Sequence, residues 1–329
     1  MTSVLLLPVL LLALHAHALN FSLSFSGTGT GDIDRVKIPL DGAGNLLNIG
    51  NGNFTIEFWM KAFLSSNTGT VSPGANDNWI TGNIIFDRDV YGNGDYGDFG
   101  ISLGSGRIAF GVNNASSSRT ILGTSQVANG QWHHIAVTRA FNGAMAIFVN
   151  GTQDAFYASG PAGNISYRTG RSTSWPNDPY LVIGAEKHDY DPSTYPSFSG
   201  WLDEVRISTN IRYTSTFQRP TEFFLHDQYT VGLFSFNEGS GTVVTNWAQV
   251  PNPTHGQRMV GGYPPRPAYS TDVPPLVPES TCLALVMLTA ACVTRVRRSA
   301  NSEIIPSHRR LLPAVLSASH TACRRLAAV

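Results

Sequence analysis

The stretch FTIEFWMKA, residues 54–62, alternates large apolar residues with residues that are mostly polar. Successive side chains of a β-strand point to opposite faces, so the alternation places the apolar set on one face and the rest on the other. The apolar set is Phe54, Ile56, Phe58 and Met60, and the other set is Thr55, Glu57, Trp59 and Lys61. The pattern predicts a strand with one face packed in a core and the other face largely polar.

The same alternation recurs on both sides of this stretch. WHHIAVTR at residues 132–139 repeats it, and two short runs, 146–149 and 154–157, flank the hairpin dipeptide Asn150-Gly151. Further runs, separated by Gly, Asn, Asp and Ser, lie at residues 36–39, 83–86, 99–103, 107–112, 181–183, 200–208 and 231–236. Many short strands without a helical period predict an all-β protein, a two-sheet antiparallel β-sandwich of the jelly-roll kind.

Five phrases in sequence order carry a family resemblance. They are FTIEFWMKA (54–62), WHHIAVTR followed by AIFVNG (132–151), FSGWLDEVRIS (198–208), IRYTSTFQRP (211–220) and LFSFNEGSGT (233–242). Together they resemble the laminin-G-like jelly-roll domains of the concanavalin A-like lectin/glucanase superfamily, over residues 19–269. The resemblance implies two antiparallel sheets of six or seven strands each, packed face to face.

The two ends of the chain differ from this central part. Residues 1–18 combine a short apolar core with the small-residue ending Ala16-His17-Ala18, which predicts a cleaved signal peptide and secretion. We expect one domain at residues 19–270, where no cysteine occurs and where the chain is long enough to fold without disulfides. We interpret residues 271–280 as a Pro-rich linker with a sorting motif, 281–298 as a short apolar segment with an Arg cluster, and 299–329 as a disordered basic tail.

The order of a Pro-Glu phrase, a short apolar run and an Arg cluster resembles a PEP-CTERM sorting signal. The resemblance implies processing by an exosortase-type enzyme, a transient membrane contact through the C-terminal segment, and a secreted protein that associates with the cell envelope. A short tail anchor is the alternative, although the apolar run at residues 282–293 is shorter than a usual membrane span.

The distribution of charge excludes one class of partner. Residues 1–294 contain 15 Lys and Arg but 21 Asp and Glu, whereas the remaining residues contain 7 and 1. The exported part is therefore mildly acidic and has no basic stripe that would follow a phosphate backbone. We expect no nucleic-acid partner.

Catalytic signatures are missing from the sequence. A glycosidase of this superfamily needs two carboxylates that flank the scissile bond, and they usually come from a Glu-x-Asp-x-x-Glu phrase, which does not occur. Glu57 stands alone in its strand, and the adjacent pair Asp203-Glu204 is expected to point to opposite faces. There is also no Gly-x-Ser-x-Gly elbow. We predict that the protein is not an enzyme, with a glycoside hydrolase as the alternative.

Closely spaced carboxylates suggest calcium as a cofactor. The loop 87–98 contains Asp87, Asp89, Asp95 and Asp98 between glycines, a composition that suits the oxygen shell of Ca²⁺ but equally suits a solvated acidic hairpin. A second acidic loop, 186–191, is a weaker candidate. Asp203 is expected on the core side of its strand with Val205, where it either caps loop amides or, as the resemblance implies, binds calcium at the rim of the sandwich.

Aromatic residues in the expected loops indicate a ligand-binding surface. They are Trp79, Tyr91, Tyr96, Trp175, Tyr190 and Tyr195. Aromatic rings beside amides and carboxylates form platforms for sugars, although each ring would serve equally well as a loop anchor. We therefore predict a secreted or cell-surface module that binds polysaccharide, another extracellular glycoconjugate or a matrix component. A passive structural spacer is the further alternative.

Overall fold

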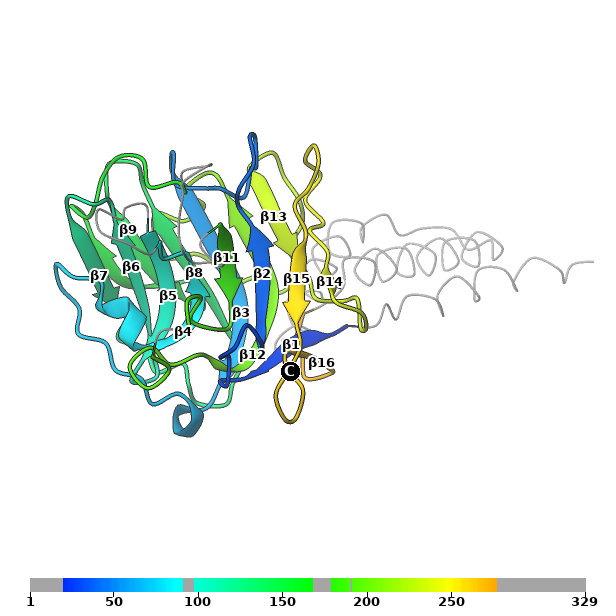
Figure 1. Cartoon of the computed structure of the whole chain (residues 1–329). Coiled ribbons are helices and arrows are strands. Elements are labelled where there is room, and N and C mark those ends of the chain that lie inside the picture. Colours follow the sequence, from blue (N-terminus) through cyan, green and yellow to red (C-terminus); the bar gives the residue numbers. More distant parts are fainter. Residues whose placement is uncertain (1–19, 91–97, 168–178, 190, 277–329) are drawn as a thin grey trace, which may run out of the picture. The chain divides into compact units, whose positions relative to one another are not determined.

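The computed structural model of the chain describes residues 20–90, 98–167, 179–189 and 191–276 (Figure 1). The chain divides into two units, and all the strands belong to the unit formed by Leu19–Pro220 and Phe224–Pro275. The expected signal peptide, the apolar segment with its Arg cluster and the basic tail lie outside the described residues. Among the described residues, no helix has the length and apolar character that a membrane crossing requires.

The first sheet, which we call sheet A, has eight antiparallel strands in the order β10-β9-β8-β3-β12-β1-β16, with β13 also paired to β12. The two strands β1 and β13 share one side of β12, because β1 pairs with its first half and β13 with its second half. The bounds of the strands are β10 Thr152–Tyr157, β9 Met145–Val149, β8 His133–Arg139, β3 Phe54–Ala62, β12 Ser199–Ser208, β1 Ser22–Ser26, β16 Ala268–Ser270 and β13 Thr230–Phe234.

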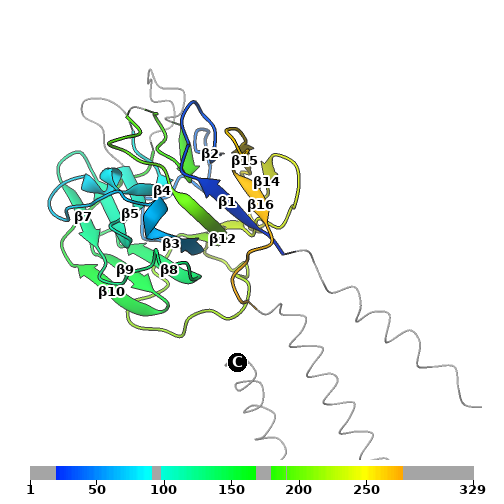
Figure 2. The same cartoon turned by 90° about the horizontal axis from the view of Figure 1, so that it is seen from below.

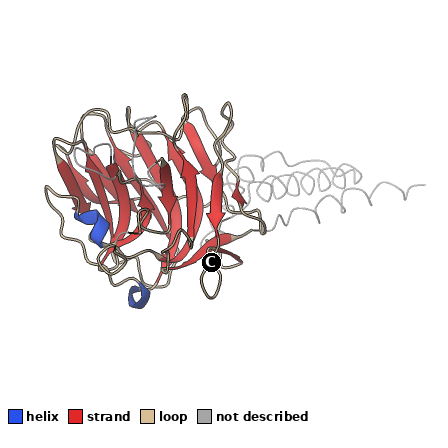
Figure 3. Ribbon diagram, in the orientation of Figure 1, coloured by secondary structure: helices blue, strands red, loops and turns tan. Residues whose placement is uncertain are grey.

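The second sheet, sheet B, also has eight antiparallel strands, in the order β14-β15-β2-β11-β4-β5-β6-β7. Their bounds are β14 Val243–Val244, β15 Gly256–Met259, β2 Arg35–Pro39, β11 Tyr180–Ile183, β4 Asn83–Asp87, β5 Asp98–Gly104, β6 Arg107–Asn113 and β7 Ser118–Leu122. The helices of the described residues are two short 3-10 turns, η1 Leu64–Ser66 and η2 Asn78–Thr81 (Figure 3).

The predicted fold class is confirmed, with more strands than expected. The two sheets form an antiparallel β-sandwich, and each contains eight strands instead of six or seven. The strands that the sequence pattern did not predict, such as β7, β15 and β16, are short and polar (SRTIL, GQRM and AYS). These strands lie at or next to the sheet edges. They form by pairing with a neighbouring strand and do not need an alternation of apolar residues, so the sequence pattern did not reveal them.

The core lies between the two sheets. All four apolar residues of β3 are buried as predicted. The ring centroids of Phe58 and Phe86 are 4.9 Å apart, and those of Phe54 and Phe99 are 5.2 Å apart, so aromatic pairs join sheet A to sheet B. Burying each such side chain contributes about 1.5–3 kcal/mol to folding. The opposite face of β3 is not solvated, because Trp59 on that face is only 1% exposed.

A β-bulge changes the side-chain directions in β12, and here the sequence prediction was wrong. Asp203 was expected on the core side with Val205, on the assumption of an unbroken alternation. The register to β3 shifts between Asp203 and Arg206, and Glu204 has a left-handed φ of 47°. As a result Leu202 and Val205 both face the core. Asp203 pairs with Trp59 on the outer face of sheet A.

The beginning and the end of the folded unit lie together. Strand β1 pairs with β16, so Ser22 is opposite Ser270 (Figure 2). The next residues remain attached, because the Ser22 hydroxyl donates to the Asp272 carbonyl at 2.6 Å. The Asp272 carboxylate also accepts from Lys61 Nζ at 2.6 Å. The ordered contacts thus extend past residue 270, into the segment that we expected to be a linker.

Candidate functional site

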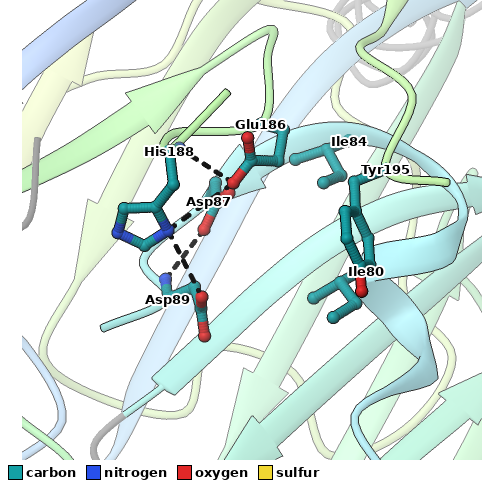
Figure 4. Close-up of a pocket in the computed structure, with 7 residues that line it drawn as sticks. All are labelled: Ile80, Ile84, Asp87, Asp89, Glu186, His188 and Tyr195. Atoms are coloured by element: carbon teal, nitrogen blue, oxygen red, sulfur yellow. Dashed lines mark hydrogen bonds and ion pairs between the residues drawn. The ribbon is translucent and has the colours of Figure 1, made fainter. Parts of the chain in front are cut away.

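A pocket of about 240 Å³ lies over β4, on the face of sheet B that points away from the core (Figure 4). Three of its residues carry carboxyl groups, one carries an imidazole, one carries a phenol, and two are isoleucines. The lining residues are Ile80, Ile84, Asp87, Asp89, Glu186, His188 and Tyr195. They come from η2, from the end of β4 and from the segment that follows β11, so strands that are distant in sequence assemble the pocket.

Asp87 is the last residue of β4 and is fixed by the backbone around it. Its Oδ1 accepts from the Asp89 N–H at 2.8 Å, and its Oδ2 accepts from the Lys187 N–H at 3.0 Å. The side chain is nearly completely buried. Burial raises the pKa of Asp87 to about 7, and the nearby charges of Asp89 and Glu186 act in the same direction. This carboxyl group is therefore able to donate or accept a hydrogen bond near neutral pH.

His188 lies between two carboxylates of the pocket. Its Nδ1 is 3.5 Å from Asp89 Oδ2 and 3.5 Å from Glu186 Oε1 (Figure 4). The His188 N–H also donates to Glu186 Oε1 at 2.8 Å. Burial opposes ionisation of Asp89, but the hydrogen bond and charge of His188, with the charge of Lys187, outweigh it and lower the pKa of Asp89. The Asp89 side chain keeps 34% of its surface exposed, so this carboxylate is partly accessible to solvent.

The other side of the pocket is apolar. Ile80 and Tyr195 are partly buried and pack against the small cluster that contains Ile84. The Tyr195 N–H donates to the Asp191 carbonyl at 2.8 Å, so a tight turn holds the tyrosine beside the strand. The pocket thus places acidic and imidazole groups opposite an aromatic and aliphatic wall. This arrangement suits a ligand with both hydroxyl groups and apolar faces.

The expected aromatic platforms have different outcomes. Tyr195 lines the pocket. Trp79 is fully buried, so its assignment as a ligand platform was wrong. Its ring occupies the space above Gly100 and Gly111, where a Cβ atom on either glycine would lie 1.9 Å from the ring. Trp79 therefore anchors η2 to sheet B. The other predicted aromatics, Tyr91, Tyr96, Trp175 and Tyr190, lie outside the described residues.

The expected calcium ligands are not brought together. Asp87 and Asp89 share the pocket, but Asp98 uses its Oδ1 to accept from the Val90 N–H at 3.1 Å. Asp203 lies on sheet A, and Asp95 is outside the described residues. Within the described ranges, no group of three or more His, Cys, Asp or Glu side chains is placed to hold a metal ion.

The two carboxyl oxygens of Asp203 differ in their contacts. Its Oδ1 accepts from the Glu204 N–H at 2.8 Å, while its buried Oδ2 has no hydrogen-bond partner. Burial, with the charge of Glu204 as a smaller cause, raises the pKa of Asp203 well above its usual value. Asp203 was expected to cap several loop amides, and in the structure it accepts from one, the Glu204 N–H.

His188 and the two isoleucines of the apolar wall were not predicted as site residues. The acidic loop 186–191 gave a signal for Glu186 but was ranked below the loop 87–98. His188 had no spaced Cys or His partner in the sequence, and its partner Asp89 becomes its neighbour only through the pairing of β11 with β4. Ile80 and Ile84 look like ordinary core residues in the sequence.

The central carboxylates of sheet A are closed off from solvent. Glu57, on the outer face of β3, is 0% exposed. It accepts hydrogen bonds from Arg206 Nε at 2.8 Å, from the Tyr213 hydroxyl at 2.7 Å and from His134 Nε2 at 3.1 Å. Burial opposes ionisation, yet these partners lower the pKa of Glu57. Tyr213 belongs to the stretch formed by residues 209–220 and 224–229, which we call the cover segment.

Two aromatic residues of the cover segment lie over the same part of sheet A. Tyr213 and Phe217 stack with ring centroids 3.5 Å apart, and Phe217 lies against the imidazole of His134. The Phe224 N–H of the cover segment donates to Glu204 Oε2 at 2.7 Å. Burial raises the pKa of Glu204 to about 7. Glu204 and Asp203 are almost completely buried.

Comparisons with known proteins agree with this fold. Residues 31–213 match the family model described as the concanavalin A-like lectin/glucanases superfamily, which is more than half of the chain. No curated protein matches the chain in sequence.

Several solved structures resemble the chain at low identity. They include a Bacteroides ovatus protein provisionally described as carbohydrate-binding, with 14% identity, a TM-score of 0.47, and coverage of 72% of this chain and 57% of that chain. A heptameric SAP-like pentraxin from Limulus polyphemus has 19% identity, a TM-score of 0.37, and coverage of 58% and 76%. Domains LG4-5 of the mouse laminin α1 chain have 13% identity, a TM-score of 0.40, and coverage of 68% and 51%. The chain spans little more than half of the first protein, and we infer no ligand from these likenesses.

Proposed function

The chain belongs to the concanavalin A-like lectin/glucanases superfamily, and from this premise we propose that it is a non-catalytic module that binds carbohydrate. The superfamily contains both sugar-binding and sugar-cleaving members, as its description states, so family membership alone does not choose between them. The choice depends on where carboxyl groups and apolar surfaces meet solvent.

The pocket over β4 is the observation that carries the proposal. Sugars present hydroxyl groups at their edges and C–H groups on their faces, so a sugar site needs polar acceptors beside an aromatic or aliphatic wall. Asp89 offers a partly exposed carboxylate on one side, and Tyr195 with Ile80 offers the wall on the other. At about 240 Å³ the pocket has room for no more than one sugar unit of a longer chain.

The burial of the carboxylates on sheet A supports a non-catalytic role. Glycoside hydrolysis uses an acid and a second carboxylate on either side of the bond that is cleaved. Glu57 is held in a closed network, Glu204 accepts from the Phe224 N–H of the cover segment, and Asp203 is buried. A polymer that lies on sheet A would therefore meet the cover segment instead of these carboxylates.

The binding test compares matched tyrosine variants of the full chain. Tyr195→Ala removes the wall of the pocket, whereas Tyr229→Ala removes a tyrosine that is 42% exposed in the turn before β13. On a panel of immobilised polysaccharides we expect Tyr195→Ala to weaken retention about tenfold, in the range of a lost aromatic contact, and Tyr229→Ala to leave it unchanged. If the wild-type chain is retained on no polymer, the proposal is wrong and a spacer role replaces it.

An assay for sugar release tests the non-catalytic part of the proposal. Wild-type protein is incubated with soluble β-glucans, and reducing ends are measured over time. We expect no release above a buffer blank. Release that disappears in Glu57→Gln would make the protein a hydrolase instead.

We also propose calcium as a stabilising ligand of the loop 87–98. The described carboxylates do not form a calcium shell by themselves, so an ion there would need oxygens from residues 91–97, which lie outside the described residues. Bound calcium would raise Tm by mass action. A Tm that is the same in calcium and in chelator would remove calcium from the proposal.

Export is the last part of the proposal. We propose that the sandwich is secreted and is held at the cell envelope through its C-terminal segment, after processing by an exosortase-type enzyme. Support comes from the sequence of residues 1–18 and 271–298 alone. The intact mass of the protein recovered outside cells would identify both processed ends, and a mass equal to the full chain would contradict the cleavage.

A further inference from the structure

The segment 184–189, which follows β11, supplies Glu186 and His188 to the pocket over β4. Its first residue, Gly184, has φ 93°, and a Cβ atom there would lie 2.3 Å from the ring of Phe25 in β1. The chain therefore leaves β11 through a conformation that glycine permits and that a larger residue would not fit. The path of the next residues decides where Glu186 and His188 lie.

One buried arginine holds this segment. Arg35, the first residue of β2, is 0% exposed and is not among the residues that line the pocket. Its Nη1 donates to the Glu186 carbonyl at 3.0 Å, and its Nη2 donates to Asp189 Oδ1 at 2.6 Å. The guanidinium thus contacts the chain on both sides of His188, once through a carbonyl and once through a carboxylate.

The same guanidinium binds the glycine-rich loop 27–34, which connects β1 to β2. Its Nη2 also donates to the Gly29 carbonyl, and its Nε donates to the Ile33 carbonyl at 3.1 Å. A guanidinium is planar and presents its donors in a fixed fork, so Arg35 holds these acceptors and those of the segment in one arrangement. A lysine carries its N–H groups on a single nitrogen and could not contact all four acceptors at once.

The loop also lies directly against the segment. A Cβ atom on Gly29 would lie 2.5 Å from the Cβ of Ala185, so this close approach requires glycine. The Asp32 N–H donates to Asp189 Oδ2 at 3.1 Å, which means that both oxygens of this carboxylate bind groups outside the segment. The glycine-rich loop therefore restricts the positions that the segment can adopt.

A shift of the segment would disturb the polar side of the pocket. The His188 N–H donates to Glu186 Oε1 at 2.8 Å, and His188 Nδ1 lies 3.5 Å from both Glu186 Oε1 and Asp89 Oδ2 (Figure 4). A displacement of about 1 Å is enough to weaken a site that depends on such polar contacts. The backbone contacts of Arg35 thus act on the imidazole through the segment that carries it.

We propose that Arg35 is a positioning residue of the pocket over β4, which holds the segment 184–189 so that Glu186 and His188 lie beside Asp89. The structural part of the inference is the control of the His188 position by Arg35. The binding part is an indirect effect of Arg35 on ligand affinity, and it rests on the proposed carbohydrate-binding function.

Two substitutions in the full chain change the support without changing a lining residue. Arg35→Lys keeps a positive charge beside Asp189 but loses contacts with the carbonyl acceptors. Gly29→Ala places a methyl group against Ala185 and keeps Arg35. If Arg35→Lys does not fold, Asp189→Asn replaces it, because that change weakens the contact with Arg35 and preserves the size of the side chain.

Each substitution has a matched control. Arg258 also donates to carbonyls of two loops, those of Gly241 and Pro267, but it packs on the ring of Tyr269 in β16, so Arg258→Lys removes comparable contacts elsewhere in the fold. Gly52→Ala controls for Gly29→Ala, because a Cβ atom at Gly52 meets nothing within 4 Å. The melting temperature of each variant establishes that it is folded.

The structural part is tested without any ligand. In protein labelled with ¹⁵N at histidine, the imidazole signal of His188 is assigned by its loss in His188→Gln. We expect this signal to shift in Arg35→Lys and in Gly29→Ala and to keep its position in both controls. If neither support variant shifts the His188 signal, Arg35 does not position the imidazole and the inference is wrong.

The binding part is tested on the polysaccharide that best retains the wild-type chain. We expect Arg35→Lys and Gly29→Ala to weaken affinity about tenfold, as the loss of a supporting residue does at other sites, and the controls to bind as wild type does. If Arg258→Lys weakens affinity as much as Arg35→Lys, the loss reflects stability alone and the inference is wrong. If the wild type binds no polymer while the His188 signal shifts in Arg35→Lys, the proposed function fails and the structural part of the inference stands.

Discussion

Trp79 owes its place to two residues that have no side chain. Gly100 of β5 and Gly111 of β6 are register partners, and together they leave a gap on the outer face of sheet B. The indole fills that gap and is 0% exposed. The sequence predicted a loop at Trp79, whereas the residue lies in the short 3-10 helix η2, and the glycines that receive its ring are 21 and 32 residues away. A single sequence contains no signal for that contact.

Alanine at either glycine should therefore destabilise the fold. In Gly100→Ala and Gly111→Ala the new methyl group overlaps the Trp79 ring, and overpacking of this kind costs about 1–3 kcal/mol. Gly52→Ala is the control, because a Cβ at that position meets nothing within 4 Å. Urea denaturation measures the free energy of unfolding for all three. Equal stability of Gly100→Ala and Gly52→Ala would mean that Trp79 does not occupy the gap.

Glu204 gives a prediction about pH. Its pKa is raised to about 7 in the folded protein by burial, against 4.5 as the ordinary value. The folded state thus favours the protonated form, so the stability that Glu204 contributes is fully present below pH 4.5 and is lost as the pH rises through 7. Glu204→Gln imitates the protonated form and can still accept from the Phe224 N–H.

The stability of Glu204→Gln relative to wild type should therefore increase as the pH rises. Between pH 5 and pH 8 we expect the free energy of unfolding of Glu204→Gln to increase relative to wild type by about 2 kcal/mol, measured by urea denaturation at each pH. Asp227 provides a control of opposite sign, because its hydrogen bonds to Arg212 lower its pKa and its contribution is lost as the pH falls. A difference between Glu204→Gln and wild type that does not change with pH would contradict the burial of a titrating carboxyl group.

At the scale of the element, the cover segment buries the face of β3 that points away from the core. The alternation in residues 54–62 correctly predicted which side chains enter the core, because periodicity in a strand depends on the backbone alone. It could not reveal that the other face is also covered, since the cover segment lies about 150 residues further along the chain. A phrase in that segment, residues 211–220, contributed to the family resemblance without any indication that its tyrosine would reach Glu57.

β12 shows the limit of periodicity more directly. The phrase GWLDEVRIS was recognised as a strand, and it is one. The alternation failed at Glu204, where one residue with positive φ moves Leu202 to the core and Asp203 to the outer face. Glutamate has no special preference for this backbone conformation, so the bulge is invisible in the sequence.

The hydrogen bond from Tyr213 to Glu57 should measure how firmly the cover segment is attached. Tyr213→Phe keeps the stacking on Phe217 and removes only the hydroxyl, which donates to a buried carboxylate at 2.7 Å. Loss of a hydrogen bond to a charged group costs about 1.5–3 kcal/mol. Tyr229→Phe is the control, because that tyrosine is exposed. Denaturation in urea gives both values, and a cost for Tyr213→Phe no larger than for Tyr229→Phe would mean that the cover segment is not fixed through Glu57.

At the scale of the whole molecule, the class of fold was predictable and the position of the sites was not. Short alternating runs and five phrases were sufficient for the two-sheet sandwich, because burial of apolar faces determines the layers. The pocket over β4 required knowledge of pairing, since β11 brings Glu186 and His188 to Asp87 and Asp89 from 97 or more residues away. The hydrogen bond from Thr254 to Asn45 similarly joins two loops that are about 200 residues apart, and only the closed sandwich makes them neighbours.

The last residues of the folded unit provide a test at this scale. Asp272 lies in the segment that the sequence assigned to a linker, yet its carboxylate accepts from Lys61 Nζ at 2.6 Å and from Trp132 Nε1 at 2.9 Å. These contacts join the end of the unit to β3 and to the residue that precedes β8. The pKa of Asp272 is lowered, because its hydrogen bonds to Lys61 and Trp132 outweigh the effect of burial.

In the full chain, Asp272→Ala should lower stability by about 1–2 kcal/mol, since the ion pair is partly exposed and is worth less than a buried one. For a domain of this size that loss corresponds to a decrease in Tm of a few degrees. Asp272→Asn retains an acceptor for the Trp132 N–H and loses only the charge, so we expect roughly half of the effect, measured by calorimetry. If both variants melt as wild type does, the contacts of Asp272 add nothing to the sandwich, and the structural domain ends with β16, as the composition of the segment first indicated.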